Sequence, residues 1–441
     1  MFQTLINAFK NKDVRNKIFL TLFILLIYRL GAWLPVPGIN GAVDAAATDD
    51  SLLGLMSAIS GGALRNGAFL AIGISPYINA SIIMQLLTVA IPGLEKLSKQ
   101  GDAGKKKLTQ ITRVFTLILA LAQAIGIVIS WHRLEGGSGL DLNLFGQGAS
   151  PFWVGMLVVV ILVAGTSFTT WLGEKITDIG VGNGISLLIF IGIISTGGQS
   201  ILDNLGQAFG VGQPYNEQAI YRLVGFLGMV LIIFVLIVYV DLAVRKVPIQ
   251  YAKQIKGRKQ YGGQSTHIPI KINASGVLPI IFAMAIVTFP QLVMQIFNGT
   301  DGAAYRGYSQ WMGAGQPLYY TIVGLLILGF SYFYAQIQFN PEEVARNIQQ
   351  YGGFIPGIRA GKPTSEYLGK ISRRLTFFGA IFLTFVAVVP SIIFGIVAGQ
   401  TNSLVNAFSA TGLLIVVSVA LEFDKQLENQ LMMKNYKGFL K

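Results

Sequence analysis

The residues that could carry out chemistry are few, and they do not combine into a catalytic group. Ser275 opens an apolar stretch within Asn273-Ala274-Ser275-Gly276, the small-residue setting of a membrane-embedded serine nucleophile. Such a serine needs a base within hydrogen-bond reach. His267 lies only eight residues upstream, too close in sequence to belong to a second helix packed against the first. Close packing of small residues between helices is the alternative interpretation, and an intramembrane enzyme stays a rival hypothesis only.

Other catalytic and cofactor motifs are absent from the sequence. There is no G-x-x-x-x-G-K-[ST] loop for nucleotide hydrolysis, and the glycines of 180–184 lack the strand and the downstream acid of a dinucleotide site. Having no cysteine excludes thiolate metal sites and disulfides, and the two histidines fall in separate loops. We therefore predict that the protein is not an enzyme and has no catalytic residue, cofactor or metal.

Composition places the chain in a membrane. Of 441 residues, 53% are hydrophobic and 12% are charged, against about 25% charged for a soluble domain. The first apolar run, Ile18 to Trp33, follows basic residues but ends in no small-residue cleavage signature. We interpret it as a retained span and not as a removed signal peptide.

Windows of about 20 residues, the length that crosses a ~30 Å hydrocarbon core, define ten candidate spans. They cover 18–33, 72–90, 109–131, 152–172, 184–197, 223–244, 274–297, 318–339, 375–397 and 411–421. At 1.5 Å per residue the fifth and the tenth are too short to cross unaided. The sequence therefore predicts an all-α polytopic membrane protein in which neighbours shield two short helices.

Charge gives the orientation of these spans, because Lys and Arg accumulate on the cytoplasmic side. With both termini in the cytoplasm, the inner segments hold 28 of the 33 basic residues. Two of the inner loops, 245–273 and 340–374, are longer than a simple connection requires. They have two interpretations, which the sequence leaves open. They are either topology determinants that touch anionic lipid or a docking surface for an acidic or nucleic-acid-containing partner.

The stretch from Ser51 to Gln85 is apolar yet too broken for a continuous lipid-facing helix. It is interrupted by Gly61, Gly62, Arg65 and Gly73, and Pro76 follows. Irregular backbone at membrane depth must be buried in protein or line a cavity. We predict a short plugging helix, a turn near 64–67, and a true span from about residue 72.

The spans form two halves of five, with interrupted segments in corresponding positions around Pro76 and Pro279. An odd number of spans per half makes the halves inverted, as in secondary transporters, whose pathway lies at the interface of the repeats. A transporter driven by protons or sodium buries carboxylates near the midplane, and none falls there. The isoleucine pairs 78/82 and 185/189 each share a helix face. One interpretation of that spacing is lipid contact or helix packing, and the alternative is a hydrophobic constriction that gates by dewetting.

Several long blocks resemble the bacterial SecY family, the channel subunits of the general protein translocase. They are GISPYINASIIMQLL, VGNGISLLIF, YAKQIKGRKQYGGQSTHIPIKIN, FNPEEVARNIQQYGGFIPGIRAGKPT, LLIVV and NYKGFL. The resemblance runs through nearly the whole chain in order, and the sequence of these blocks is similar to that in low-GC Gram-positive bacteria. It implies ten transmembrane helices in two inverted five-helix halves, 1–200 and 201–441, around a central pore with a plug helix.

The resemblance also implies roles for individual residues. A ring of aliphatic side chains at the waist of the pore would comprise Ile78, Ile82, Ile185, Ile189, Ile281 and Ile415. The plug, about 51–66, would include Ser51, Leu55, Ile59, Gly61, Gly62, Arg65 and Asn66. A lateral gate between the second and third spans on one side and the seventh and eighth on the other would carry Thr88, Gln123 and Asn273. The surface that docks a motor or a ribosome would carry Arg245, Arg258 and Arg359.

The implied partners are the SecE and SecG subunits, the SecA motor ATPase, the ribosome, signal peptides and nascent polypeptides, with anionic lipids around them. The implied location is the bacterial plasma membrane, with both termini cytoplasmic. The chain departs from the family pattern at two places. It has Arg359-Ala360-Gly361 where relatives commonly have Arg-Pro-Gly, and Ala410-Thr411-Gly412 where Gly-Thr-Ser is usual. The second departure makes the register of Ile415 less certain.

Overall fold

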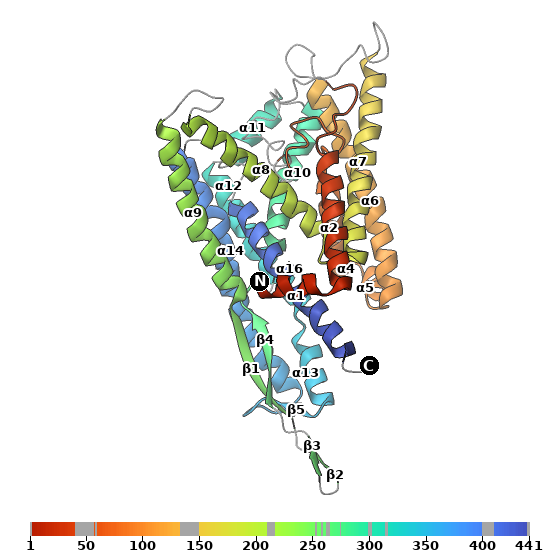
Figure 1. The fold of residues 1–441 in the computed structure, drawn as a ribbon, viewed down its shortest axis with the longest axis vertical. Coiled ribbons are helices and arrows are strands. Elements are labelled where there is room, and N and C mark those ends of the chain that lie inside the picture. Colours follow the sequence, from red (N-terminus) through yellow and green to blue (C-terminus); the bar gives the residue numbers. More distant parts are fainter. Residues whose placement is uncertain are drawn as a thin grey trace.

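The computed structural model describes most of the chain as a bundle of long helices with a small sheet beyond one end (Figure 1). The described residues are 2–39, 57, 60–132, 150–209, 217–251, 254–256, 259–261, 265–273, 275–298, 302–313, 316–398 and 410–438. Of the predicted site residues, Ser51, Leu55, Ile59 and Arg258 lie outside them.

Ten helices in the described part of the chain overlap the ten predicted spans in order, which is consistent with the predicted count. They are α2 (Lys12–Gly31), α4 (Ser75–Ala90), α6 (Asp102–His132), α7 (Pro151–Ile179), α8 (Gly184–Phe209), α9 (Glu217–Leu242), α10 (Leu278–Asn298), α12 (Pro317–Gln338), α14 (Lys362–Ala398) and α16 (Ala410–Gly438). Six of them, α6, α7, α8, α9, α12 and α14, are long and apolar enough to cross a membrane by themselves, among the residues described. The pair α4 and α5 (Pro92–Ser98), bent by 105°, would make a seventh.

Two of the predicted spans are longer as helices than we expected. The predicted fifth span, 184–197, is helix α8 with 26 residues, so the expectation that it is too short to cross unaided is wrong. Polar residues beyond position 197 lower the hydropathy without ending the helix, and Asn204 donates to the carbonyl of Ser200 within it (2.8 Å). Residue 200, our predicted boundary between the halves, therefore lies inside α8. Likewise α16 continues to Gly438, 29 residues in all, because its charged second half is still helical.

Helix α7 illustrates how the sequence builds the interior of the bundle. It begins with Pro151 in its first turn, where a missing N–H costs no hydrogen bond. Its buried residues recur every three or four positions along one face: Val154, Val158, Leu162, Gly165, Thr169, Leu172 and Ile176. This period of 3.6 packs one face of α7 against α6 and α8. The buried face of α7 contributes to two of the three largest apolar clusters, one around α6 and α7 and one around α2 and α8. The third joins α9, α10, α12, α14 and α16.

Strands in the long loops are an addition to the predicted all-α architecture. β1 (Val244–Tyr251) pairs antiparallel with β4 (Ser265–Lys271) and with β5 (Gly353–Phe354). β2 (Gln254–Lys256) and β3 (Lys259–Tyr261) pair farther out. The shorter helices α1 (Phe2–Lys10), α11 (Ala303–Met312) and α13 (Pro341–Gln350) complete the described elements. Figure 1 shows the hairpin of β1 and β4, together with α13, projecting from the side of the bundle on which both labelled chain ends lie.

The base of this projection has a small apolar core of its own. Its buried members come from β1 and β4, from α13, from the residue after β5 and from α14: Val247, Ile249, Ile270, Ile348, Ile355 and Leu368. Along β1 the buried residues alternate with exposed ones, as expected for a strand with one face covered. The described parts of the two long loops therefore share one core and form one unit.

Gly165 is where α7 passes closest to the chain that leads into α4. A Cβ added at Gly165 would overlap the carbonyl oxygen of Phe69. We expect Gly165→Ala to lower the stability by about 3 kcal/mol, the upper end of overpacking effects, because the obstacle is backbone. Gly225→Ala is the matched control, since a Cβ there meets nothing within 4 Å. The measurement is the thermal unfolding midpoint of each variant in detergent; equal midpoints would contradict the prediction.

Candidate pore

A cavity of about 560 Å³ lies among α4, α8, α10 and α16. Six isoleucines from these four helices line it: Ile78, Ile82, Ile185, Ile189, Ile281 and Ile415. Ile82 and Ile189 are each only 6% exposed, and the others are half-buried. The structure thus brings together, on one cavity, all six residues that the family resemblance singled out, including Ile415 despite its uncertain register. Their function as a seal stays a proposal.

The approach to α4 sets the direction of its two isoleucines. Gly73 has φ +61°, a left-handed conformation in which a side chain is strained. Pro76 then occupies the first turn of α4, which fits its fixed φ and missing N–H. The helix therefore starts at Ser75, three residues later than predicted, and presents Ile78 and Ile82 on one face.

The approach to α8 uses a polar cap. The side-chain oxygen of Asn183 accepts from the backbone N–H of Ile185 (3.1 Å), and the hydroxyl of Thr177 accepts from the N–H of Gly184 (2.9 Å). These two bonds satisfy donors that a helix start leaves unpaired. They fix the first turn of α8, from which Ile185 and Ile189 face the cavity.

The cavity has a polar part as well as an aliphatic one. Its lining includes Asp241, Lys271, Asn273, Glu422 and Lys425. The side-chain amide of Asn273 donates to Asp241 (3.0 Å), which joins the end of α9 to the segment entering α10. The sequence did not predict that these charged residues lie together on the cavity.

The described part of the predicted plug is a turn that returns to the bundle. Gly61 and Gly62 have φ +73° and +84°, and the N–H of Gly62 donates to the carbonyl of Ser57 (2.8 Å). Arg65 and Asn66 are exposed at the turn, where we predicted one. Beyond it, the chain is held by backbone hydrogen bonds from Val36 to Gly67 (2.9 Å) and from Phe69 to Leu34 (2.8 Å). Of the helix predicted before this turn, 51–56, 58 and 59 lie outside the described residues, Ser57 is helical, and 60–63 form turns.

The three predicted gate residues lie on or beside contacting helices. α4 packs on α6, and both contact α10. Thr88 donates to the carbonyl of Met84 in its own helix (2.7 Å). Gln123 and Asn273 are 7% and 6% exposed, and the side-chain carbonyl oxygen of each has no hydrogen-bond partner among the described residues. Within this part of the chain no hydrogen bond joins the three to one another, so the structure brings their helices together but not their polar groups.

Two of the three predicted docking cations are on the projecting unit. Arg245 is exposed on β1, and Arg359 is exposed in the turn between β5 and α14. The backbone carbonyl of Arg359 accepts from the Thr364 hydroxyl (2.8 Å), and Gly361, with φ +97°, closes the turn. The turn is therefore held through main-chain groups, which leaves the Arg359 side chain at the surface.

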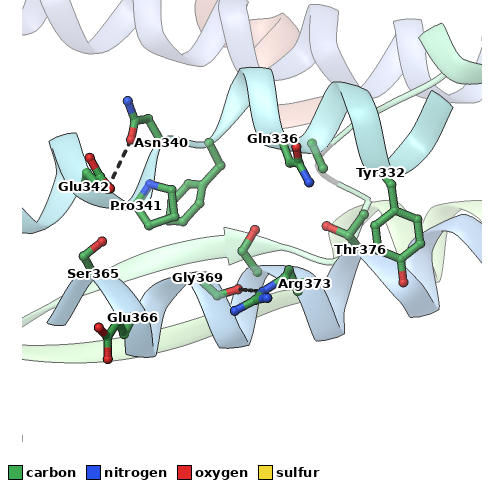
Figure 2. Close-up of a pocket in the computed structure, with 13 residues that line it drawn as sticks. Tyr332, Gln336, Asn340, Pro341, Glu342, Ser365, Glu366, Gly369, Arg373 and Thr376 are labelled. Atoms are coloured by element: carbon green, nitrogen blue, oxygen red, sulfur yellow. Dashed lines mark hydrogen bonds between the residues drawn. The ribbon is translucent and has the colours of Figure 1, made fainter. Parts of the chain in front are cut away.

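A second cavity, of about 400 Å³, lies where α12 passes into α13 and faces α14 (Figure 2). The side chain of Asn340 caps α13 by accepting from the N–H of Glu342 (3.1 Å). Across the cavity, Arg373 donates to the carbonyl of Gly369 (3.4 Å) within α14. Glu342 and Glu366 lie toward one end of the view, and Tyr332 and Thr376 toward the other. This mixed lining favours no single charge of ligand, and we interpret the cavity as the junction that sets α13 against α14.

Fold and cavity together define a polytopic helical membrane protein of the channel type. The model of the SecY family matches residues 68–423. The protein translocase subunit SecY of Bacillus licheniformis is 42% identical over 442 residues, and that of Streptomyces scabiei is 41% identical over 451; each alignment covers 100% of both chains. The chain belongs to the SecY family. Its similarity to these two relatives is nearly equal, so the resemblance to low-GC Gram-positive sequences gains no support over a Streptomyces-like one.

Solved structures share the fold. One, described as "The structure of a protein conducting channel", has a TM-score of 0.67 at 20% identity and covers 94% of this chain and 91% of its own. Another, "Sec61 in the Canine ribosome-channel complex from the endoplasmic reticulum", has a TM-score of 0.63 at 18% identity, with the same coverage. At these identities the likeness establishes the architecture alone.

Proposed function

We propose that this protein is the channel through which unfolded polypeptides cross the bacterial plasma membrane and through which membrane segments leave sideways into lipid. As a member of the SecY family it is a translocase subunit and not an enzyme. The observation that carries the proposal is that all six isoleucines line one cavity, together with several charged residues.

An aliphatic constriction suits a channel that must pass chains of any sequence. Strong binding groups would arrest some substrates, whereas aliphatic side chains exclude water without directional bonds and can spread around a chain. The six isoleucines form the seal in this proposal, and the segment 51–66 forms a plug that adds a second barrier. The seal lies between two inverted five-helix halves that meet near the end of α8.

The lateral exit lies between α4 and α6 on one side and α10 and α12 on the other. Support comes from the contact of α6 with α10 and from the buried carbonyl oxygens of Gln123 and Asn273, which have no hydrogen-bond partner among the described residues. Unpaired buried polar groups weaken an interface, as expected where two helices must part. Thr88 completes the polar set in this proposal.

The projecting unit is the docking surface in our proposal, with the termini on the cytoplasmic side. The hairpin segment 245–271 carries seven basic residues and no acidic one, and Arg245 and Arg359 are exposed on the unit. Such a surface attracts acidic or nucleic-acid-containing partners, which fits a motor ATPase of the SecA type and the ribosome. SecE and SecG subunits would surround the bundle, with anionic lipids at its basic rim.

Transport of a signal-bearing precursor tests the proposal. The full-length protein, with its membrane partners and a motor ATPase, is reconstituted into vesicles, and the precursor is expected to become inaccessible to added protease. A precursor without a signal sequence is the control. Ion-coupled uptake of a small solute by the chain alone, without precursor protection, would favour a secondary transporter and contradict the proposal.

A further inference from the structure

The turn 180–184, which leads from α7 into α8, has glycine at every second position. A Cβ added at Gly184 would overlap the carbonyl oxygen of Gly173 in α7. Gly182 has φ +91°, a conformation that side chains rarely adopt, and a Cβ there would lie 3.3 Å from the ring of Phe423 in α16. These two glycines therefore let the turn approach both α7 and α16 closely.

The third glycine of the turn faces a hydroxyl of α2. A Cβ added at Gly180 would lie 2.6 Å from Oγ1 of Thr21. That hydroxyl accepts a hydrogen bond from the backbone N–H of Val181 (3.1 Å), 160 residues away in the chain, and it donates to the carbonyl of Lys17 in its own helix (2.9 Å). Thr21 is 2% exposed, and Val181 is fully buried. A buried N–H needs a hydrogen-bond partner, and α2 supplies the partner here.

Apolar contacts surround this hydrogen bond. Val181 belongs to one buried cluster with Ala8 of α1, with Val14 and Ile18 of α2 and with Leu427 of α16. The turn therefore packs in a single cluster with three helices other than the two that it connects. Such packing is typical of a fixed connection and not of a flexible one.

Two of the helices that meet at the turn carry three of the six isoleucines of the cavity. Ile185 is the second residue of α8, directly after the turn, and Ile189 follows one helical turn later. Ile415 lies in α16. Because the capping segment sets where and in which direction a helix starts, a shift of the turn would move Ile185 and Ile189 together.

We propose that Thr21 is a positioning residue for the seal. By accepting from the N–H of Val181, it holds the turn 180–184 against α2 and so fixes the direction in which Ile185 and Ile189 enter the cavity. The inference deepens the proposed function and rests on it. Thr21 does not line the cavity itself, so it acts through α8 and needs no contact with a translocating chain.

Ion leak through the full-length protein in vesicles tests this role. Thr21→Val keeps the shape of the side chain and removes the hydroxyl, which leaves the buried N–H of Val181 without its acceptor. We expect the leak to rise about fivefold, because the turn must shift to satisfy that donor. Thr21→Ser keeps the hydroxyl and should restore the leak of the unchanged protein.

Thr166→Val is the matched control. Thr166 is fully buried in α7, and its hydroxyl donates to the carbonyl of Leu162 in the same helix (3.2 Å). The variant loses an intrahelical bond of the same kind as that between Thr21 and Lys17, and it should leave the leak unchanged.

Hydrogen exchange of the segment 177–187 is measured in the same variants, because it reports the turn independently of the cavity. Thr21→Val is expected to speed exchange at the amides of the turn about tenfold, whereas Thr166→Val should not change it. Unchanged exchange in Thr21→Val, or faster exchange with an unchanged leak, would overturn the positioning role.

Ile82→Asn, which changes the cavity itself, separates this inference from the proposed function. A leak in Ile82→Asn but none in Thr21→Val would refute the positioning role alone. If neither variant leaks, the proposed seal is refuted, and the role of Thr21 in positioning it fails with it. Should Thr21→Val fail to accumulate, Gly180→Ala takes its place, since its Cβ would push the turn away from Thr21 and is expected to raise the leak as well.

Discussion

Changing Ile82 to asparagine is expected to raise ion leak through the resting channel about tenfold. Ile82 lines the cavity and is almost fully buried, and an amide there would hydrogen-bond to water that the isoleucine excludes. A reduction of about 1.4 kcal/mol in the free energy of wetting the constriction corresponds to that factor. The measurement is the conductance of planar bilayers or the dye release of vesicles that contain the full-length protein.

Ile82→Asn should also let precursors with weak signal sequences cross, because the closed state that a signal must open is less stable. Ile82→Leu is the matched control, as it keeps the aliphatic surface and should keep the seal. If Ile82→Asn and Ile82→Leu give equal leak and equal signal selectivity, the cavity is not the permeability barrier.

Reversing the charge of Arg359 is expected to reduce motor-driven secretion about tenfold or more while leaving expression and membrane insertion intact. The fold tolerates the change, because the turn is held through the carbonyl of Arg359 and through Gly361. An acidic motor surface that meets Arg359 would meet a glutamate in the variant, and like charges in contact cost several kcal/mol. Secretion is measured with a motor-dependent precursor in inverted membrane vesicles.

Lys105→Glu is the control for Arg359→Glu. Lys105 is exposed at the start of α6, away from the projecting unit, so the same change in net charge should have little effect there. Arg359→Lys should retain most of the activity. Normal secretion by Arg359→Glu, or an equal loss in Lys105→Glu, would remove Arg359 from the docking role.

The hydrophobic pattern was sufficient to predict the order of the helices, because each span is a local property of about 20 residues. The predicted helix ends were wrong where polar residues continue a helix, as they do in α8 after residue 197. The hairpin was also missed, although the alternation of buried Val247 and Ile249 with exposed neighbours is a strand signal. The many basic residues of 245–271 are typical of a charged loop, and they obscure this alternation with a period of two.

The cavity could be predicted only in part. Spacing alone put Ile78 and Ile82 on one helix face, and it favoured lipid contact or helix packing over a pore. The family resemblance supplied the set that the structure gathers on one cavity. The hydrogen bond that Nη1 of Arg29 donates to the backbone carbonyl of Gly61 (2.6 Å) could not be predicted from the sequence. It joins residues 32 apart and requires the fold of the turn between them. An arginine and a glycine pair in apolar segments were visible signals, but nothing in the sequence connected them.

Contact between the cavity and a substrate in transit is the most direct test of the account. A photoreactive residue is placed at Ile82 or at Ile189, and at Val160 as a control on the surface of α7, where it is 58% exposed. Each variant is given a secretory precursor stalled by a folded domain at its end. The account predicts precursor adducts from Ile82 and Ile189 and none from Val160. Adducts from Val160 alone, or none from either isoleucine while the precursor is stalled, would contradict it.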